Sequence, residues 1–263
     1  MNLRSRRGVA LVLVLWIVVI LGGVSAGVVR SARTSTGIAA NARADLIARA
    51  AAESGIEVFV AAIEDTLASF EDPEDRRDWL NALSLSVVPD SPSLGSFTLG
   101  DGRFSVNVVD VSARLDVNAA TATALQTFFS QFTDPAEAAG IAGAIRAAID
   151  SGSNRDAGAT LPLRSTTPIR SLDELHDRRL VPDAILSRAA QYLTVDGDGV
   201  INARTASDTV LVAATGELRD EPSRLLLISR GWVSGHPLTR EIQAVYSITG
   251  NRLVFSHWRE RSL

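Results

Sequence analysis

The chain has 263 residues, of which 46% are hydrophobic and 21% are charged, and its formal net charge at pH 7 is −4. This length accommodates one large or two small domains, and the composition is ordinary for a globular protein. The acidic balance does not favour nucleic acid as a partner, since domains that bind phosphate backbones normally carry a basic stripe. The lack of cysteine excludes disulfides, thiolate catalysis and cysteine-based zinc sites.

The N-terminal region contains an uncharged apolar run from Val9 to Val29. Three basic residues precede this run: Arg4, Arg6 and Arg7. About 20 helical residues cross the hydrocarbon core of a bilayer, so the run is long enough to span one. The arginines predict a cytoplasmic N-terminus, which places the rest of the chain outside the cytoplasm. Two alternatives are a cleaved secretory signal, with a site in the VSA sequence before Gly27, and a simple uncleaved anchor.

The helical pattern continues without a break from Arg30 to about Ser69. Apolar residues recur there at steps of three and four, as is typical of an amphipathic helix. These residues are Ile38, Ala42, Leu46, Ala50, Ile56, Phe59, Val60, Ile63 and Leu67. We therefore predict one long helix that is apolar on all sides at first and amphipathic later.

A short helix and a hairpin are expected next. The Asp-Pro pair at 72–73 predicts a stop, after which a short helix is expected around Glu74 to Leu83. The segment "RFSVNVVDV" alternates apolar and polar residues, which predicts a strand with Phe104, Val106 and Val108 on one face. The "GDG" sequence before it is typical of a tight hairpin turn.

Three more alternating segments end the chain, at residues 224–234, 238–249 and 252–261. The turn-forming sequences "GHP" and "GN" separate them, so they predict three hairpin-linked strands of an antiparallel sheet. Such a sheet usually has one covered face. We expect the amphipathic half of the N-terminal helix to cover it.

Between these strand regions lies a block with helical character, from about Ser112 to Tyr192. Its four segments open on Asn, Asp-Pro, Ser or Pro-Asp, which are typical helix starts. Asn118 and Asn202 begin two similar phrases, "NAATA" and "NARTA". We interpret each asparagine as an N-cap whose side chain accepts a backbone N–H. The block therefore predicts an all-helical insert within a β framework.

The N-terminal motifs resemble a known family. "RRG/VALVLVLW", followed by a helix carrying "NARADLIARAAAESGIEVFVAAI", is similar to the N-terminus of type IV pilin-like proteins, and most similar to the K-type minor pseudopilin of the type II secretion system. "LDVNAATATAL", "SLDEL" and "YLTVDGDGVINARTASDTVL" extend the resemblance over almost the whole chain. The resemblance implies that a prepilin peptidase cleaves between Gly8 and Val9, that the helix stays on the mature protein, and that Val9 is N-methylated.

Leu13 occupies the fifth position of the expected mature chain. Most pilins and pseudopilins carry Glu there, whereas the K-type subunit is known for an apolar residue, so this departure supports the specific resemblance. The buried carboxylate of ordinary subunits is thought to pair with the N-terminal amine of a neighbour, which offsets its cost in apolar surroundings. The alternative is that Leu13 is one more lipid-facing leucine.

The fold class that we expect is α+β, with a long N-terminal transmembrane and amphipathic helix packed on an antiparallel sheet, as in pilins, and with an inserted all-helical domain. The expected divisions are a leader (1–8), the transmembrane half of the helix (9–29), the amphipathic helix with the first part of the pilin-like domain (30–111), the inserted helical domain (112–195) and the C-terminal part of the pilin-like domain (196–263).

The main alternative function is a membrane-anchored DNA-uptake protein, because "VNAATATAL" also occurs in helix-hairpin-helix modules. Those modules bind phosphate through a glycine-rich turn, but here Asp134 and Glu137 occupy the corresponding stretch. No hydrolase motif is present, and the three histidines, His176, His236 and His257, are isolated in the sequence. We expect no enzyme activity and no nucleic-acid partner.

Calcium is the one cofactor that we expect, because the resemblance implies a calcium site in the helical insert. Its matching loop is "IDSGSNRDAGA", with Asp150, Asn154 and Asp156 as candidate oxygen ligands. Asp196 and Asp198 in "VDGDGV" are further candidates, although this sequence is more typical of a hairpin turn.

The resemblance implies a single-pass inner-membrane subunit with a periplasmic C-terminal domain. Its work would be assembly: initiating or capping the tip of a short pseudopilus for protein export across the outer membrane. The implied partners are other minor pseudopilins in a tip complex, the prepilin peptidase and the inner-membrane secretion platform. A minor pilin of a related type IV pilus is the remaining alternative.

Mass spectrometry of the native protein tests the fate of the N-terminal segment. We expect a mature chain that begins at methylated Val9. A first residue near Gly27 would indicate a secretory signal, and an intact Met1 would indicate a plain anchor; either result would contradict the prediction.

Overall fold

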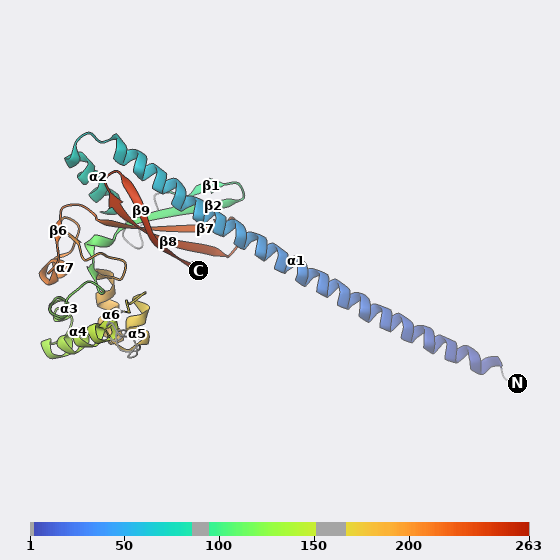
Figure 1. The fold of residues 1–263 in the computed structure, drawn as a ribbon. Coiled ribbons are helices and arrows are strands. Elements are labelled where there is room, and N and C mark those ends of the chain that lie inside the picture. The colour runs from blue at the N-terminus through green and yellow to red at the C-terminus, as the bar shows by residue number, and fades with distance from the viewer. Residues whose placement is uncertain (1–2, 86–94, 151–166, 263) are drawn as a thin grey trace, which may run out of the picture.

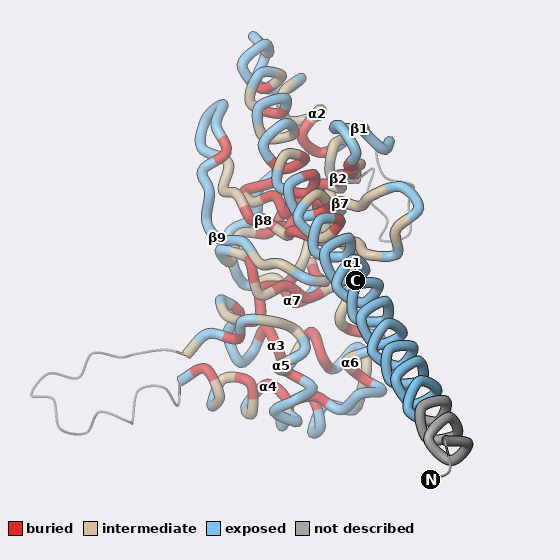
Figure 2. The backbone as a smooth tube through the Cα atoms, turned by 90° about the vertical axis from the view of Figure 1, so that its right-hand side faces the viewer, coloured by how far each residue is buried: buried red, intermediate tan, exposed pale blue. Residues whose placement is uncertain are grey.

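The structure is a computed structural model that describes residues 3–85, 95–150 and 167–262. One helix dominates it: α1 (Leu3–Ser69) runs for 67 residues and projects far beyond the rest of the molecule (Figure 1). Its N-terminal part lies free, and its C-terminal part lies against a sheet (Figure 2). The prediction of one unbroken helix to Ser69 is confirmed.

The next helix, α2 (Pro73–Leu85), confirms the short helix expected around Glu74 to Leu83, and its first residue is the proline of the Asp-Pro pair. Asp72 Oδ1 accepts the backbone N–H of Glu74 at 2.7 Å, which satisfies one of the free donors of the first turn. The second Asp-Pro pair begins α4 in the same way. There Asp134 Oδ1 accepts the N–H groups of Ala136 and Glu137, both at 3.0 Å.

The central sheet is antiparallel, with strand order β1-β2-β7-β8-β9. Its strands are β1 (Phe97–Leu99), β2 (Gly102–Asp110), β7 (Arg224–Val233), β8 (Thr239–Thr249) and β9 (Arg252–Ser262). The predicted hairpin at "GDG" joins β1 to β2, with Gly100 at φ +57°, a conformation that favours glycine. Phe104, Val106 and Val108 are buried on the face that α1 covers, as expected.

Strand β9 contains a bulge opposite Val245 and Tyr246. Val245 pairs with His257, whereas Tyr246 pairs with Phe255, so Ser256 is skipped in the register between β8 and β9. An extra residue reverses the alternation of side chains between the faces of a strand. Phe255 and Trp258 consequently lie on the α1 side of the sheet, and His257 lies on the opposite side.

The helical part lies on the side of the sheet away from α1 (Figure 1). Its helices are α3 (Ala122–Phe129), α4 (Pro135–Asp150), α5 (Asp173–Asp177), α6 (Asp183–Ala189) and α7 (Asp208–Ala213), with 3-10 turns η1 (Val111–Ala113) and η3 (Ala190–Tyr192). Two short pairs of parallel strands accompany these helices: β3 (Leu115–Asp116) with β4 (Leu193–Thr194), and β5 (Ile201–Asn202) with β6 (Leu218–Arg219). Its hydrophobic core extends past the expected boundary at 195, because Ile201, Val210 and Ala213 belong to it.

The two asparagines interpreted as N-caps have other roles, so that prediction is wrong. The N-cap of α3 is Thr121, whose hydroxyl accepts the N–H of Ala124 at 3.1 Å. Asn118 instead joins distant loops, since its side chain bonds both backbone groups of Ile169. Asn202 is fully buried and donates to Asn81, while Ser207 occupies the N-cap position of α7.

Helix α1 meets the sheet at two glycines. A Cβ on Gly231 of β7 would lie against the carbonyl oxygen of Ala48 and 2.6 Å from the amide nitrogen of Ala52. A Cβ on Gly55 of α1 would lie 2.8 Å from the ring of Phe104. Real Cβ contacts are essentially never this short. The α1 and β7 backbones can therefore approach one another at Gly231 because it lacks a side chain, and Gly55 leaves room for side chains of the sheet.

Replacing Gly231 with alanine should therefore destabilise the domain by about 3 kcal/mol, because the helix or the strand must shift to relieve the overlap with backbone atoms. Urea unfolding of the full chain in detergent, followed by tryptophan fluorescence, measures the change. Gly143→Ala is the matched control, since nothing lies within 4 Å of its Cβ in α4; we expect a gain of roughly 0.5 to 1 kcal/mol there. Equal unfolding midpoints for the two variants would contradict the close-contact interpretation.

Candidate assembly surface and the interface between the two cores

The N-terminal part of α1 is an apolar surface without a protein partner in this chain. Every residue from 13 to 43 is exposed, a rod of about 46 Å at 1.5 Å per residue. The helix contains a window of mean hydropathy 2.2 with none of it buried, which makes it long and apolar enough to cross a membrane. Leu13 is 57% exposed and Trp16 is 63% exposed. The rod is uncharged as far as Val29, and an apolar surface of that length requires lipid or other protein to cover it.

The predicted processing site also lies in α1. The backbone of Gly8 and Val9 is helical and continuous with the rod. Their side-chain environments lie outside the described part of the structure. Cleavage between them, and N-methylation of Val9, stay predictions.

Ion pairs hold the amphipathic half of α1 against the sheet at the point where the rod leaves it. Asp45 of α1 accepts a hydrogen bond from Arg240 Nε of β8 at 2.5 Å, and this bond lowers the pKa of the Asp45 carboxyl. Arg49 lies 3.7 Å from Glu260 of β9. Exposed pairs of this kind contribute little stability, but they restrict how the helix can rotate on the sheet.

A buried polar network joins the sheet, α2 and the helical part. Asp110, at the end of β2, accepts hydrogen bonds from Ser112 N at 2.7 Å, Asn202 Nδ2 at 2.7 Å and Thr205 Oγ1 at 2.6 Å. Asn202 also donates to Asn81 Oδ1 of α2 at 2.8 Å. Burial raises the pKa of Asp110, although its three donors oppose that shift. Sequence reasoning missed this network; its one signal was a carboxylate at an inward position of an alternating strand.

A second set of contacts joins the helical part to β9. Asp196 is buried and accepts hydrogen bonds from His257 Nε2 at 3.0 Å and Arg259 Nη2 at 2.8 Å. Asp198 accepts from Ser223 Oγ at 3.1 Å and lies 3.6 Å from Arg224 Nε. Both carboxylates thus face cationic or donor groups, which does not fit a calcium site. The interpretation of "DGDG" as a hairpin turn is wrong, because the strands on either side of it pair with other strands: β4 with β3, and β5 with β6.

The expected calcium ligands are only partly described. Asp150 ends α4, and its carboxylate accepts from Arg146 Nη2 at 3.2 Å. Asn154 and Asp156 lie outside the described residues. Within the described ranges, no group of three or more histidine, cysteine or acidic side chains is placed to hold a metal ion. Calcium in this loop stays a prediction.

The turn between α3 and α4 has no free donors for a phosphate at its helix start. Asp134 already accepts the first N–H groups of α4, and its negative charge would repel an anion. The three histidines are dispersed: His176 contacts Asp183, His236 contacts Asn41 and His257 contacts Asp196. Across residues 3–85, 95–150 and 167–262, the structure therefore brings together neither the elements of a helix-hairpin-helix phosphate site nor a histidine cluster.

Comparisons with known proteins identify the fold. No protein-family model and no curated protein matches the chain. Among solved structures it is similar to a chain of the GspK-GspI-GspJ complex from the type 2 secretion system of enterotoxigenic Escherichia coli. The TM-score is 0.58 with 14% sequence identity, and the match covers 86% of this chain and 99% of that chain. The expected pilin-like α+β fold is confirmed.

Asp116 gives a test of the interface through pH. Its carboxylate is buried and accepts the N–H of Asn118 at 2.9 Å, and burial raises its pKa above the ordinary 3.8, with Asp198 adding to the rise and Arg224 opposing it. A carboxyl group whose pKa is higher in the folded than in the unfolded state stabilises the fold at low pH. This stabilisation is lost as the pH rises through the folded-state pKa. Asp116→Asn keeps the acceptor without the charge.

We therefore expect Asp116→Asn to be more stable than the wild type at neutral pH, with the difference shrinking as the pH falls toward 3.8. Urea unfolding across a pH series measures it. Asp45→Asn should instead be less stable than the wild type at neutral pH. The lowered pKa of Asp45 means that its ionised form stabilises the fold above pH 3.8. Parallel pH profiles for the two variants would contradict this assignment.

Proposed function

We propose that this chain is a minor pseudopilin of a type II secretion system, which helps to initiate or cap the tip of the pseudopilus. The observation that carries the proposal is the continuous α1 rod, which is exposed over residues 13–43, apolar as far as Val29, and fixed to a folded domain by its other half. The fold similarity to a chain of the GspK-GspI-GspJ complex supports it. On this proposal the work of the chain is assembly, without enzyme activity.

The membrane step follows from the composition of α1. A prepilin peptidase acts at Gly8–Val9 on the cytoplasmic side and leaves the apolar half in the inner membrane, with the folded domain in the periplasm. The retained helix then packs against the helices of sister subunits, which replaces lipid contact with close side-chain packing. The secretion platform in the inner membrane is the site at which such subunits gather.

Two features favour a position at the tip. Leu13 offers no carboxylate to the N-terminal amine of a neighbouring subunit, so a subunit with this residue does not require a neighbour above it. The helical part widens the domain sideways from the axis of α1 (Figure 1). A subunit stacked above would have to avoid this added width.

Co-expression of the tagged full chain with candidate minor subunits from the same organism tests the proposal. We expect the subunits to co-purify in detergent at a fixed stoichiometry with the tagged chain. An unrelated tagged single-pass protein is the control for chance residence in one micelle. Retention no greater than in this control would contradict the proposal.

A further inference from the structure

Helix α1 leaves part of the sheet uncovered. It packs on β2, β7 and β8. Its polar contacts with β9 lie near the two ends of that strand, at Leu253 and Glu260. The bulge in β9 turns Phe255 and Trp258 to this same face, where they are 53% and 45% exposed. Two large aromatic side chains therefore lie in solvent on the face of the sheet that is otherwise its core side.

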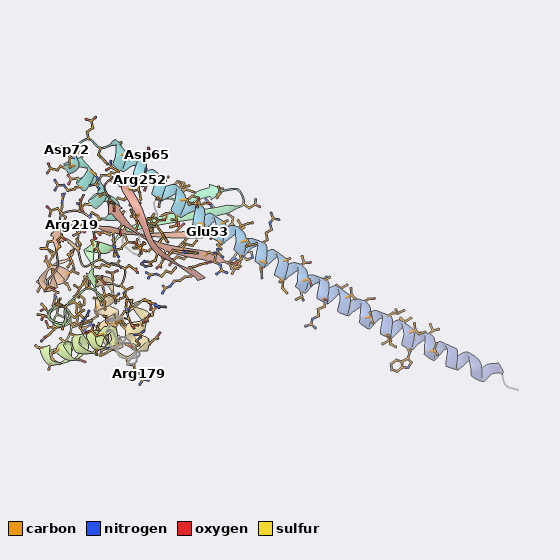
Figure 3. All side chains as sticks on the ribbon, viewed as in Figure 1. Glu53, Asp65, Asp72, Arg179, Arg219 and Arg252 are labelled. Carbon is orange, nitrogen blue, oxygen red and sulfur yellow. The ribbon has the colours of Figure 1, made fainter. Side chains whose placement is uncertain are left out.

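A groove of about 290 Å³ separates these aromatics from α1. Its lining comes from three elements: Glu53, Ile56 and Glu57 of α1, Ile242, Ala244 and Tyr246 of β8, and Phe255 and Trp258 of β9. Figure 3 labels Glu53 at the point where α1 passes over the strands. The Tyr246 and Phe255 rings meet edge to face at 5.7 Å, so the apolar floor is preformed.

The groove is bounded at both ends by contacts between α1 and β9. Glu64 accepts the N–H of Leu253 at 2.8 Å at one end, and Arg49 lies near Glu260 at the other. Residues 49 and 64 are about 22 Å apart along a helix. This length matches about four helical turns.

The α1 rim of the groove is acidic. Glu53 pairs with Arg49, but Glu57 makes no hydrogen bond or ion pair among the described residues. The charges of Glu57 and Glu64 act on Tyr246, whose pKa is raised chiefly by burial and further by these carboxylates. An apolar floor beside an unpaired carboxylate fits a partner with apolar side chains and a cation next to them.

We propose that this groove receives the amphipathic part of the N-terminal helix of a different minor subunit, with an arginine or lysine opposite Glu57. This inference rests on the proposed function, because it takes the partner from the same assembly. Leu46 is 68% exposed and lies seven residues before Glu53 and eleven before Glu57, so the three share one face of α1. A partner helix that packs along the exposed rod therefore continues into the groove, with the usual distance of about 8–10 Å between its axis and that of α1.

A helix fits better than an added β-strand. The aromatic side chains point from the face of the sheet and not from its edge, and the bulge interrupts the regular edge of β9 that a new strand would need. The partner therefore contacts side chains of α1, β8 and β9 together.

The test uses the full chain in the co-expression assay described above. Phe255→Ser combined with Trp258→Ser should weaken retention of the partner at least about tenfold, because a few aromatic side chains usually contribute most of the binding free energy of such an interface. Val254→Ser is the matched control, since Val254 is 51% exposed on the same strand but points to the opposite face. Unfolding midpoints of all variants show whether the domain stays intact.

Charge reversal supplies the second arm. Glu57→Arg should weaken the complex, and replacing the facing cation of the partner with glutamate should restore it, which a merely structural role of Glu57 would not produce. A wild-type complex that resists both the double variant and Glu57→Arg would overturn the groove while leaving the proposed function standing. Absence of any wild-type complex would refute both. A dimer of this chain alone that the double variant abolishes would assign the groove to a second copy and overturn the proposal.

Discussion

The contact on which the molecule depends is the close approach of α1 to the sheet, backbone to backbone at Gly231 of β7 and through side chains of the sheet at Gly55. Small buried residues of α1 line it: Ala48 and Ala52 at Gly231, and Ala51 at Gly102 of β2. A helix that rests on backbone has fewer ways to tilt than one that rests on long, adaptable side chains. The free part of α1 extends for tens of ångströms beyond this contact, so a small error of angle there would become a large displacement at the N-terminal end. The glycine contact thus sets the direction of the rod.

The bulge at Val245/Tyr246 gives β9 two roles. Without the extra residue, the side chains beyond it would exchange faces. The observed register sends His257 and Arg259 to Asp196 of the helical part, and it sends Phe255 and Trp258 to the α1 side. One strand therefore fastens the helical part on one face and presents an aromatic surface on the other.

Local patterns predicted most of the fold, and contacts between distant residues account for the errors. The Asp-Pro starts at Pro73 and Pro135 and the alternation in β2 depend on neighbours in the sequence, so they could be predicted. Asn118 and Asn202 had the composition of N-caps, but their partners lie 51 residues away at Ile169 and 121 residues away at Asn81. The bulge in β9 has no signature in an alternating segment. The apolar half of the rod, as far as Val29, could be predicted because lack of charge over such a length is itself the signal.

The two attachments in the molecule use opposite physics. Helix α1 is held mainly by an apolar core and a close approach at Gly231, whereas the helical part is attached through buried polar groups around Asp110 and Asp196. Burying a carboxylate costs free energy unless its donors are correctly placed, so the polar attachment tolerates few alternative orientations. Rod, sheet and helical part are consequently fixed in one arrangement. A domain fixed in this way relates the direction of its exposed N-terminal helix to the surface of the helical part.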